Sequence, residues 1–376
     1  MAKKEKEDKK PVGEEALDKV NEYVTKESTI KKKSFSLKDY KKEKGLDNVK
    51  FKPQEWLTFP KAFIDATGIP GIPLGCITLL RGHSDTSKST AMLLAAIEAQ
   101  KKNILPVFII TEMKWSWEHA KTMGLEYEEI KNSKGEIENY DGFFVYVDRG
   151  KLKSIEDVAV FINELLDEQE KGKLPHDLLF LWDSIGSIPC QMSIEKGKNN
   201  NEWNAGAMSV QFGSHVNQRI VYSRKEDFPY INTFVCVNKI WVRKADSPMG
   251  QPTMKNKGGD TMFYDASLII NFGNIATAGI NKIKATKNGK EVLFGTRVRV
   301  QIEKNHINGI STTNKIIVTP TGYIADDKNE IEKYKKENLS YFMTLLGEGG
   351  GDFETVIEED VQKDVYDAEP DEEITM

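Results

Sequence analysis

The segment CITLLRGHSDTSKST, residues 76–90, decides the fold expected for this chain. Its first five residues form an apolar run that predicts a buried strand, and the run AMLLAA at residues 91–96 predicts a helix. A polar loop between a strand and a helix aims backbone N–H groups and the helix N-terminus at a phosphate chain. The order of strand, polar loop and helix therefore predicts a phosphate-binding loop.

The loop fits the Walker A pattern G-x-x-x-x-G-K-[ST], except that Ser87 replaces the second glycine. In this pattern the lysine neutralises the outer phosphate oxygens and the next hydroxyl holds Mg²⁺. We therefore expect ATP and Mg²⁺ as cofactors, with Lys88 in a catalytic role and Ser89 as a metal ligand. The alternative is a polar turn with an incidental Lys-Ser pair. The residues expected to contact the nucleotide here are Gly82, His83, Ser84, Asp85, Thr86, Ser87, Lys88, Ser89 and Thr90.

Two acids follow other apolar runs. Asp183 ends the run LLFLW at residues 178–182, which is the Walker B form, in which a carboxylate orients water and hydroxyl groups around the metal. We expect Asp183 to contribute to the nucleotide site and to bind the metal. Glu112 follows the run VFII at residues 107–110, across Thr111, where a carboxylate polarises the water that attacks the γ-phosphate.

Apolar runs alternate with polar helical stretches along most of the chain. This alternation predicts an α/β fold with a mostly parallel twisted sheet flanked by helices, in which loops at the carboxyl ends of the strands carry the chemistry. The expected strands lie at 76–80, 105–110, 143–147, 178–182, 233–237, 268–272, 298–302 and 316–318, and the expected helices at 90–101, 117–123, 155–170 and 205–223.

The composition of the 376 residues, with 39% hydrophobic and 30% charged, is that of a soluble globular protein. No apolar run approaches the roughly 18 residues that span a bilayer, and the Lys-rich N-terminus lacks the apolar stretch of a signal peptide, so we expect no membrane partner. The cysteines, Cys76, Cys190 and Cys236, form no CxxC pair, which argues against a disulfide framework or a zinc site. A reducing cytoplasm is the expected location.

The formal charge of -5 is distributed unevenly. Residues 1–50 carry 15 Lys and 11 acids, a balance of +4, whereas residues 348–376 carry 12 acids and one Lys, a balance of -11. We expect a Lys-rich arm or oligomerisation segment at 1–55, a folded ATPase core at 56–346 and a disordered acidic tail at 347–376. Such a tail can compete with nucleic acid for the basic face of its own protein.

Further segments resemble the RecA recombinase family and, more closely, its UvsX-like phage branch. The resemblance implies a RecA-like P-loop ATPase core that binds ATP between adjacent subunits and, for a phage-encoded protein, the host cell cytoplasm as its location. The segments that carry it follow the family's order along residues 60–325, at 68–75, 111–112, 119–125, 237–239, 248–252, 258–264 and 296–306.

The resemblance assigns roles to individual residues. Glu112 stands at the position of the catalytic glutamate, and Lys304 at that of a catalytic lysine that reaches the ATP of the neighbouring subunit. His306 replaces the second lysine expected there. Lys239 occupies the position that senses the γ-phosphate, where bacterial members usually have Gln. His119 lies in the segment beside the adenine, and the nearby Trp117 remains an alternative stacking residue.

The resemblance also implies two loops that bind DNA, which requires basic groups for phosphates and apolar groups for bases. The first loop, at 193–203, contributes Lys196 and Lys198, although an ordinary charged surface loop has the same composition. In the second loop Met249 is the apolar residue that wedges into the strand. The residues expected to bind DNA there are Arg243, Lys244, Met249, Gly250, Lys255, Lys257, Gly258 and Gly259.

These observations predict an ATP-dependent DNA recombinase that forms filaments on single-stranded DNA and promotes pairing and strand exchange with double-stranded DNA. The expected partners are both forms of DNA, further copies of the chain, and single-strand-binding and loader proteins. Two alternatives remain. A ring helicase on the same fold shares the nucleotide-site residues, and a non-hydrolysing DNA-binding filament protein accommodates the unusual Ser87 and Lys239.

Overall fold

The computed structural model describes residues 36–46, 50–84, 86–243, 253–256, 258–273, 282–287, 290–338, 340 and 354–356. The chain divides into two units, Met1–Lys50 and Phe51–Met376. In the first unit the described residues form helix α2 (Leu37–Glu43), which begins where the Ser36 hydroxyl accepts a hydrogen bond from the backbone N–H of Asp39. All residues of α2 are exposed, so this helix buries no core of its own.

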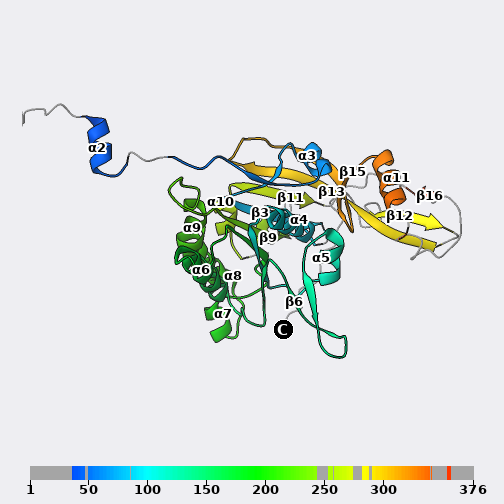
Figure 1. Cartoon of the computed structure of the whole chain (residues 1–376), viewed down its shortest axis with the longest axis horizontal. Coiled ribbons are helices and arrows are strands. Elements are labelled where there is room, and N and C mark those ends of the chain that lie inside the picture. The colour runs from blue at the N-terminus through cyan, green and yellow to red at the C-terminus, as the bar shows by residue number, and fades with distance from the viewer. Residues whose placement is uncertain are drawn as a thin grey trace, which may run out of the picture. The chain divides into compact units, whose positions relative to one another are not determined.

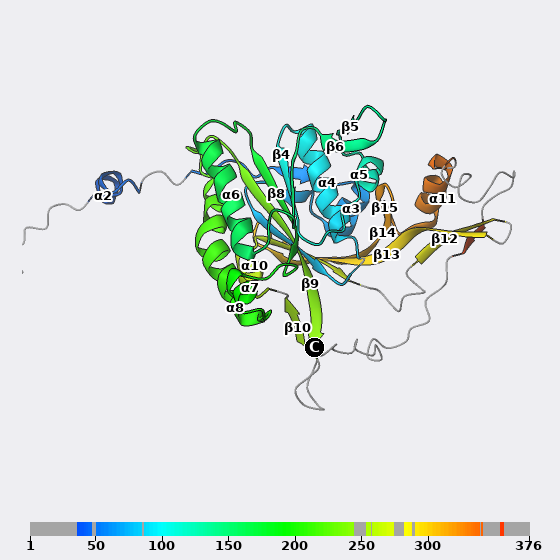
Figure 2. The ribbon, with the colours of Figure 1, turned by 90° about the horizontal axis from the view of Figure 1, so that it is seen from below.

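The second unit is built on one large twisted sheet (Figures 1 and 2). Its strand order is β15-β14-β13-β11-β3-β9-β8-β4-β7, in which the strands from β11 to β7 pair in parallel and the others are antiparallel. The parallel strands are β3 (Ile77–Gly82), β4 (Leu105–Ile110), β7 (Val145–Asp148), β8 (Leu178–Ile185), β9 (Asn232–Arg243) and β11 (Leu268–Gly273). The antiparallel strands are β13 (Lys290–Asn305), β14 (Thr313–Thr319) and β15 (Gly322–Ala325).

Helices cover both faces of this sheet, because the parallel strands are apolar on both sides. In β3, for example, Leu80 belongs to the core on one face and Leu79 to the core on the other. Figure 2 shows α4 and α6 on opposite sides of β8 and β4. One face carries α3 (Lys61–Thr67), α4 (Lys88–Lys101) and α5 (Trp117–Met123), and the other α6 (Ile155–Glu170), α7 (Gln191–Glu195), α8 (Asn201–Met208), the π-helix η1 (Ser209–Val216), α9 (Asn217–Tyr222) and α10 (Thr261–Asp265). The predicted α/β fold with a mostly parallel sheet is confirmed.

Smaller elements complete the second unit, and two of the strand pairs form separate two-stranded sheets. The hairpin β5 (Glu128–Lys131) and β6 (Ile137–Asp141) follows α5, and β1 (Trp56–Thr58) pairs with β2 (Gly71–Pro73). Strand β10 (Thr253–Asn256) pairs with the end of β9. Strand β12 (Lys282–Lys287) lies between β13 and β16 (Glu354–Val356), and α11 (Lys328–Glu337) packs beside β15 through a small separate core.

Some predicted features lie outside the described residues. These are the first 35 residues of the N-terminal arm and most of the acidic tail. Within the part of the chain that the structure describes, no helix combines the length and apolar character needed to cross a membrane.

Candidate nucleotide-binding site

The loop of residues 82–90 joins the buried strand β3 to helix α4, as its sequence predicts. Gly82 is required at the strand end, since its φ is 150° and a Cβ there would lie 2.0 Å from the carbonyl oxygen of Phe272. The Thr86 hydroxyl donates to the carbonyl of His83 at 2.8 Å, and the buried Lys88 ammonium donates to the same carbonyl. The loop therefore curls over its own lysine at the start of α4. Asp85, also expected here, lies outside the described residues.

Ser89 and Asp183 meet at the carboxyl end of the sheet. The Ser89 hydroxyl donates to Oδ2 of Asp183 at 2.6 Å. Burial raises the pKa of the Asp183 carboxyl, although the hydrogen bond from Ser89 opposes that effect. A hydroxyl and a carboxylate together suit Mg²⁺, which binds few protein oxygens and completes its shell with phosphates and water. The described residues contain no cluster of three or more acids, His or Cys that would hold a metal alone.

Glu112 follows β4 and is held by two partners. The Lys239 ammonium lies 2.8 Å from its Oε1, and the Ser184 hydroxyl donates to the same oxygen at 2.7 Å. Burial raises the pKa of the Glu112 carboxyl, but the hydrogen bonds and charge of these partners prevail and hold it below its usual range. In this arrangement Glu112 is ionised and its charge is neutralised by Lys239.

A hydroxyl network fixes the strand ends that carry these acids. The buried Thr111 hydroxyl accepts hydrogen bonds from the indole N–H of Trp182 at 3.0 Å and from the backbone N–H of Ser184 at 3.1 Å. Ser187 reaches the same hydroxyl at 2.5 Å. Because Thr111 directly precedes Glu112, the network ties β4 to β8 and orients the carboxylate. The sequence did not predict that Ser184 would donate a hydrogen bond to Glu112, because its position next to Asp183 gives no sign of this contact.

One cavity of about 270 Å³ unites the residues that the motifs predicted from distant parts of the chain. It receives side chains from the 82–90 loop and from the ends of β4, β8 and β9, with β13 and β14 on one side. Lys114 also lines it, although no sequence motif pointed to that residue. The lining residues are Ser84, Thr86, Ser87, Lys88, Ser89, Thr90, Glu112, Lys114, Asp183, Val237, Lys239, Thr296 and Val318.

The two candidates for stacking on adenine do not line this cavity. His119 is exposed in the first turn of α5, where its backbone N–H is capped by the Ser116 hydroxyl. The Trp117 ring stacks on Tyr140 with centroids 4.5 Å apart and also packs against Trp115 and Phe144. Since these contacts already occupy the Trp117 ring, His119 is the freer of the two side chains.

Lys304 lies away from the cavity in its own subunit. It pairs with Ile269 near the start of β11, whereas Thr296, at the cavity, belongs to the other half of the same strand β13. The Lys304 ammonium donates to the backbone carbonyls of Phe263 and Tyr264 at 3.2 and 2.7 Å. A role at an ATP of the same subunit is therefore incompatible with this position.

The residues expected to bind DNA are only partly described. Strand β9 runs beyond the sheet as far as Arg243 and returns as β10, so that Arg243 pairs with Thr253 and Trp241 with Lys255. Lys196 and Lys198 are exposed between α7 and α8. The side chains of Arg243 and Lys255, and all of Lys244, Met249, Gly250 and Lys257, lie outside the described part.

Gly258 and Gly259 anchor the return from the second predicted loop. Their φ angles are 82° and 90°, a region that favours glycine. A Cβ on Gly259 would lie 2.7 Å from the Cβ of Ala205 in α8, and one on Gly258 3.0 Å from Ile185. These glycines therefore bring the chain close to α8 and to the end of β8, beside the cavity strands.

Comparison with known proteins finds that the chain is similar to RecA proteins. The protein RecA of Nitratidesulfovibrio vulgaris is 23% identical over 266 residues, which cover 67% of this chain and 64% of that protein. The RecA of Oleidesulfovibrio alaskensis is 23% identical over 242 residues, covering 64% of this chain and 58% of that protein. The chain is thus similar to RecA proteins at low identity over about two thirds of its length.

A shorter match to the RecA of Aquifex aeolicus reaches 38% identity over 65 residues, which are 17% of this chain. No family model matches the chain. The alignments span less than two thirds of the length of these RecA relatives, 64% in the first. The RecA relationship agrees with the mostly parallel sheet and flanking helices described above.

Proposed function

We propose that this protein is an ATP-dependent DNA recombinase that forms filaments on single-stranded DNA and promotes homologous pairing and strand exchange. The observation that carries the proposal is the convergence of Lys88, Ser89, Glu112, Asp183 and Lys239 at one cavity in a chain related to RecA. These residues come from four separate strand ends, so a chance match to one motif does not account for their meeting.

Five residues of the cavity, together with Lys304, each have a defined task in this proposal. Lys88 neutralises phosphate oxygens of ATP, while Ser89 and Asp183 hold Mg²⁺. Glu112 accepts a proton from the attacking water, and Lys239 responds to the charge of the terminal phosphate. Lys304 supplies a cation to the ATP of the neighbouring subunit, as an arginine finger does.

DNA binding falls to the two predicted loops. Lys196 and Lys198 contact phosphates from the first loop, and the basic residues and Met249 of the second contact phosphates and bases. We further propose that the protein belongs to the UvsX-like phage branch and acts with single-strand-binding and loader proteins. Base pairing between strands, rather than protein contacts, then selects the homologous sequence.

The test measures ATP hydrolysis with and without single-stranded DNA, and images the protein on DNA with a slowly hydrolysed ATP analogue. We expect DNA-stimulated hydrolysis, helical filaments, and joint molecules in a strand-exchange assay. Lys88→Ala should lose ATP binding or hydrolysis, since it removes the buried charge beneath the loop. Rings instead of filaments would favour the helicase alternative.

One observation favours a second candidate, a filament protein that binds ATP without hydrolysing it. The Glu112 carboxylate already has Lys239 and Ser184 as partners, and a carboxylate held in this way is a weaker base. In that case filaments would form with ATP, but no phosphate would be released with or without DNA.

A further inference from the structure

Lys114 lines the nucleotide cavity although none of the motifs assigned it a role. It is an exposed residue, and among the described residues it has no hydrogen bond and no acid within ion-pair distance. The other two lysines of the cavity have protein partners, because Lys239 pairs with Glu112 and Lys88 donates to the carbonyl of His83. Lys114 is therefore the cavity cation most available to a bound anion.

The backbone between Glu112 and Lys114 takes an uncommon path. Met113 has a φ of 56°, in the left-handed region, and its side chain is 68% exposed. A residue with a side chain in that region costs about 1–3 kcal/mol, and such positions concentrate at binding and catalytic sites. The turn directs Met113 into solvent and returns the next side chain, Lys114, to the cavity. Helix α5, capped by Ser116, then fixes the far side of this turn.

The charged side chains that line the cavity carry a net positive charge. Lys88, Lys114 and Lys239 outnumber Glu112 and Asp183 by one. The Lys114 charge also lowers the pKa of the Glu112 carboxyl. Its ammonium thus acts on the same end of the cavity as Glu112, where the terminal phosphate is expected to react.

We propose that Lys114 binds the terminal phosphate of a nucleoside triphosphate and makes the cavity prefer triphosphate over diphosphate. This inference rests on the proposed function, because it requires that the cavity bind ATP. The terminal phosphate adds negative charge and three acceptor oxygens, and a lysine on a flexible stem meets them as a mobile point charge. A diphosphate lacks these oxygens and leaves Lys114 in solvent.

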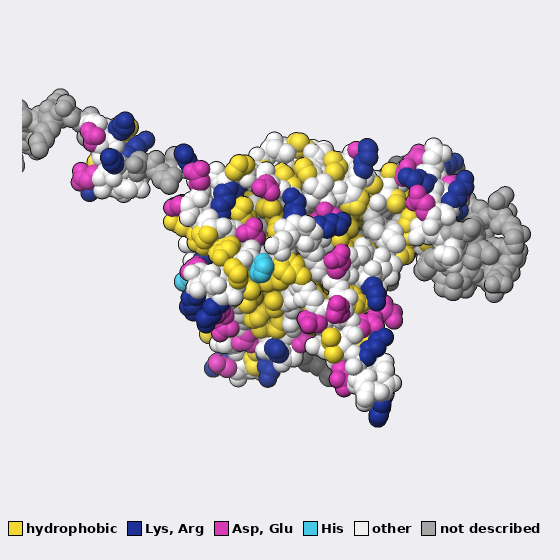
Figure 3. Space-filling model, in the orientation of Figure 1, with side chains coloured by type: hydrophobic (Ala, Val, Ile, Leu, Met, Phe, Trp, Pro, Cys, Tyr) yellow, Lys and Arg dark blue, Asp and Glu magenta, His cyan; other side chains and the backbone are white. Residues whose placement is uncertain are grey.

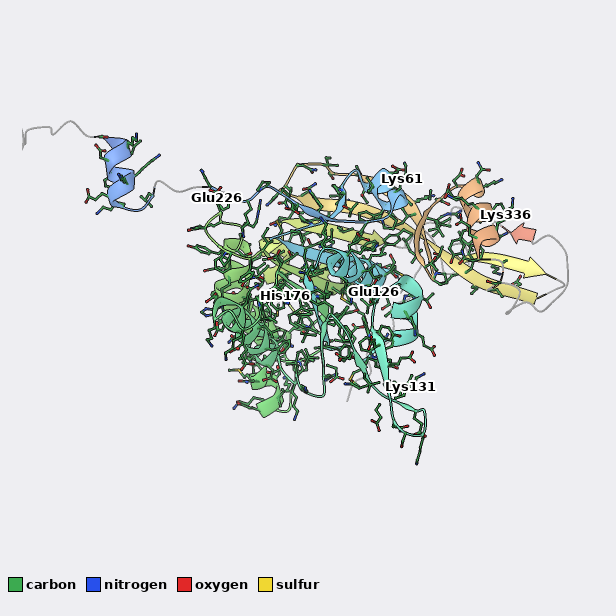
Figure 4. All side chains as sticks on the ribbon, viewed as in Figure 1. Lys61, Glu126, Lys131, His176, Glu226 and Lys336 are labelled. Carbon is green, nitrogen blue, oxygen red and sulfur yellow. The ribbon has the colours of Figure 1, made fainter. Side chains whose placement is uncertain are left out.

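The experiment measures the dissociation constants of Mg²⁺-ADP and of a non-hydrolysable Mg²⁺-ATP analogue without DNA. It compares the full-length wild-type protein with Lys114→Ala, Lys114→Arg and Lys134→Ala. Lys134 is a matched control, since it is exposed in the turn between β5 and β6. Figure 4, in which Lys131 of the same hairpin is labelled, shows that the hairpin projects away from the large sheet.

We expect Lys114→Ala to weaken binding of the ATP analogue by about tenfold and that of ADP by less than about twofold, as befits one charge-assisted contact. Lys114→Arg should recover most of the loss, and Lys134→Ala should match the wild type. The unfolding midpoint without nucleotide should stay nearly unchanged, because Lys114 is exposed and forms no hydrogen bond or ion pair with the described residues.

Three results would overturn the inference while leaving the proposed function intact. They are equal losses for both nucleotides, no loss for either, and a fall in the unfolding midpoint that accounts for the weaker binding. A wild-type protein that binds neither nucleotide would instead refute the proposed function, and the inference with it.

Discussion

At the scale of single residues, Ser87 is the clearest departure from the Walker A pattern, which has glycine at this position. Its φ is 77°, and its buried hydroxyl has no hydrogen-bond partner in the described structure. Both features cost stability, because a side chain disfavours the left-handed region and a buried hydroxyl loses its hydration. We predict that Ser87→Gly raises the free energy of unfolding by about 0.5–1 kcal/mol. Urea denaturation of the nucleotide-free protein measures this change.

Ser84→Gly is the control for this prediction. Ser84 is exposed in the same loop and does not have a positive φ, so glycine there adds freedom to the unfolded chain without relieving strain. It should not raise stability. A destabilised Ser87→Gly variant would mean that the Ser87 side chain makes a contact that outweighs its conformational cost.

The pairing of Lys239 with Glu112 predicts a pH dependence. Lys239 and Ser184 lower the pKa of Glu112 against the effect of burial, so the carboxylate stays ionised to a lower pH than it otherwise would. Lys239→Ala removes the cation and leaves burial, which raises the pKa. We therefore expect the acid limb of the ATPase pH profile to move to higher pH. Lys239→Arg, which keeps the charge, should leave the limb nearer to its original position.

The same pair contributes to stability with a defined sign. A carboxyl whose pKa is depressed on folding stabilises the protein above its unfolded pKa, and this contribution is lost as the pH falls through the folded pKa. Lys239→Ala should therefore reduce the loss of stability in that acidic window. An unchanged acid limb together with an unchanged acid unfolding curve would show that the pair does not control Glu112.

The residues of the site differ in how far sequence alone could reveal them. Lys88, Ser89 and Asp183 follow from motif spacing, because the strand-to-loop context restricts where such groups point. Ser184 and Lys114 were not predictable in this way. Their roles depend on how β4 and β8 align and on the left-handed turn at Met113, and neither feature has a spacing signature.

At the scale of elements, the buried strands were predictable and the exposed ones were not. Strand β4 has the predicted bounds, since a continuous apolar run bounded by polar residues fixes both ends. Strand β13 was expected at 298–302 but spans Lys290–Asn305, because the residues on both sides of the predicted stretch include charged and polar side chains. Hairpin strand β5 was missed, because its mostly exposed residues leave no apolar pattern to detect.

The helix expected at 205–223 shows a different limit. It is observed as three consecutive segments, α8, η1 and α9, covering Asn201–Tyr222. The apolar spacing located the helical stretch but did not predict that Ser209–Val216, which packs against α6 and α10, is π-helical. The spacing therefore predicted the extent of this element but not its local hydrogen-bond geometry.

The course of strand β13 leads to a prediction about how neighbouring subunits share the nucleotide site. It connects the cavity, at Thr296, with Lys304 at the opposite edge of the sheet. We predict that Lys304→Ala leaves ATP binding by the isolated subunit unchanged but reduces DNA-stimulated hydrolysis by about 100-fold, as loss of a cation supplied in trans would. Nucleotide binding and steady-state hydrolysis of the variant test both parts.

Mixing variants tests whether the site is shared. Glu112→Gln should bind ATP yet hydrolyse it about 100-fold more slowly, because it lacks the base. In a mixture with Lys304→Ala, some interfaces combine an intact Glu112 with an intact Lys304, so activity should rise above that of either variant alone. The absence of such rescue at every mixing ratio would argue that Lys304 does not reach the ATP of a neighbouring subunit and only holds α10 through the carbonyls of Phe263 and Tyr264.

At the scale of the whole molecule, acidic and basic side chains are separated along the sequence, but they are mixed on the face of the second unit that Figure 3 shows. On the face seen in Figure 3, Lys and Arg side chains of the second unit are interspersed with Asp and Glu side chains. In the sequence, by contrast, residues 357–376 carry nine acids and one lysine, a balance of -8 within a total of -5. Without them the remaining chain carries +3. A weakly basic body thus adjoins a strongly acidic terminal segment.

This contrast predicts that the terminal segment competes with DNA. Truncation after residue 356 retains β16, which pairs with β12, so the variant tests the acidic residues without removing a strand of the sheet. We expect it to bind single-stranded DNA more tightly than the full chain in the presence of an ATP analogue. The gain should be largest in dilute salt and should shrink as the Debye length falls below about 10 Å near 0.1 M salt. A variant with the nine acids changed to Asn and Gln separates charge from length, and superimposable salt curves for all three proteins would show that the segment has no access to the DNA-binding residues.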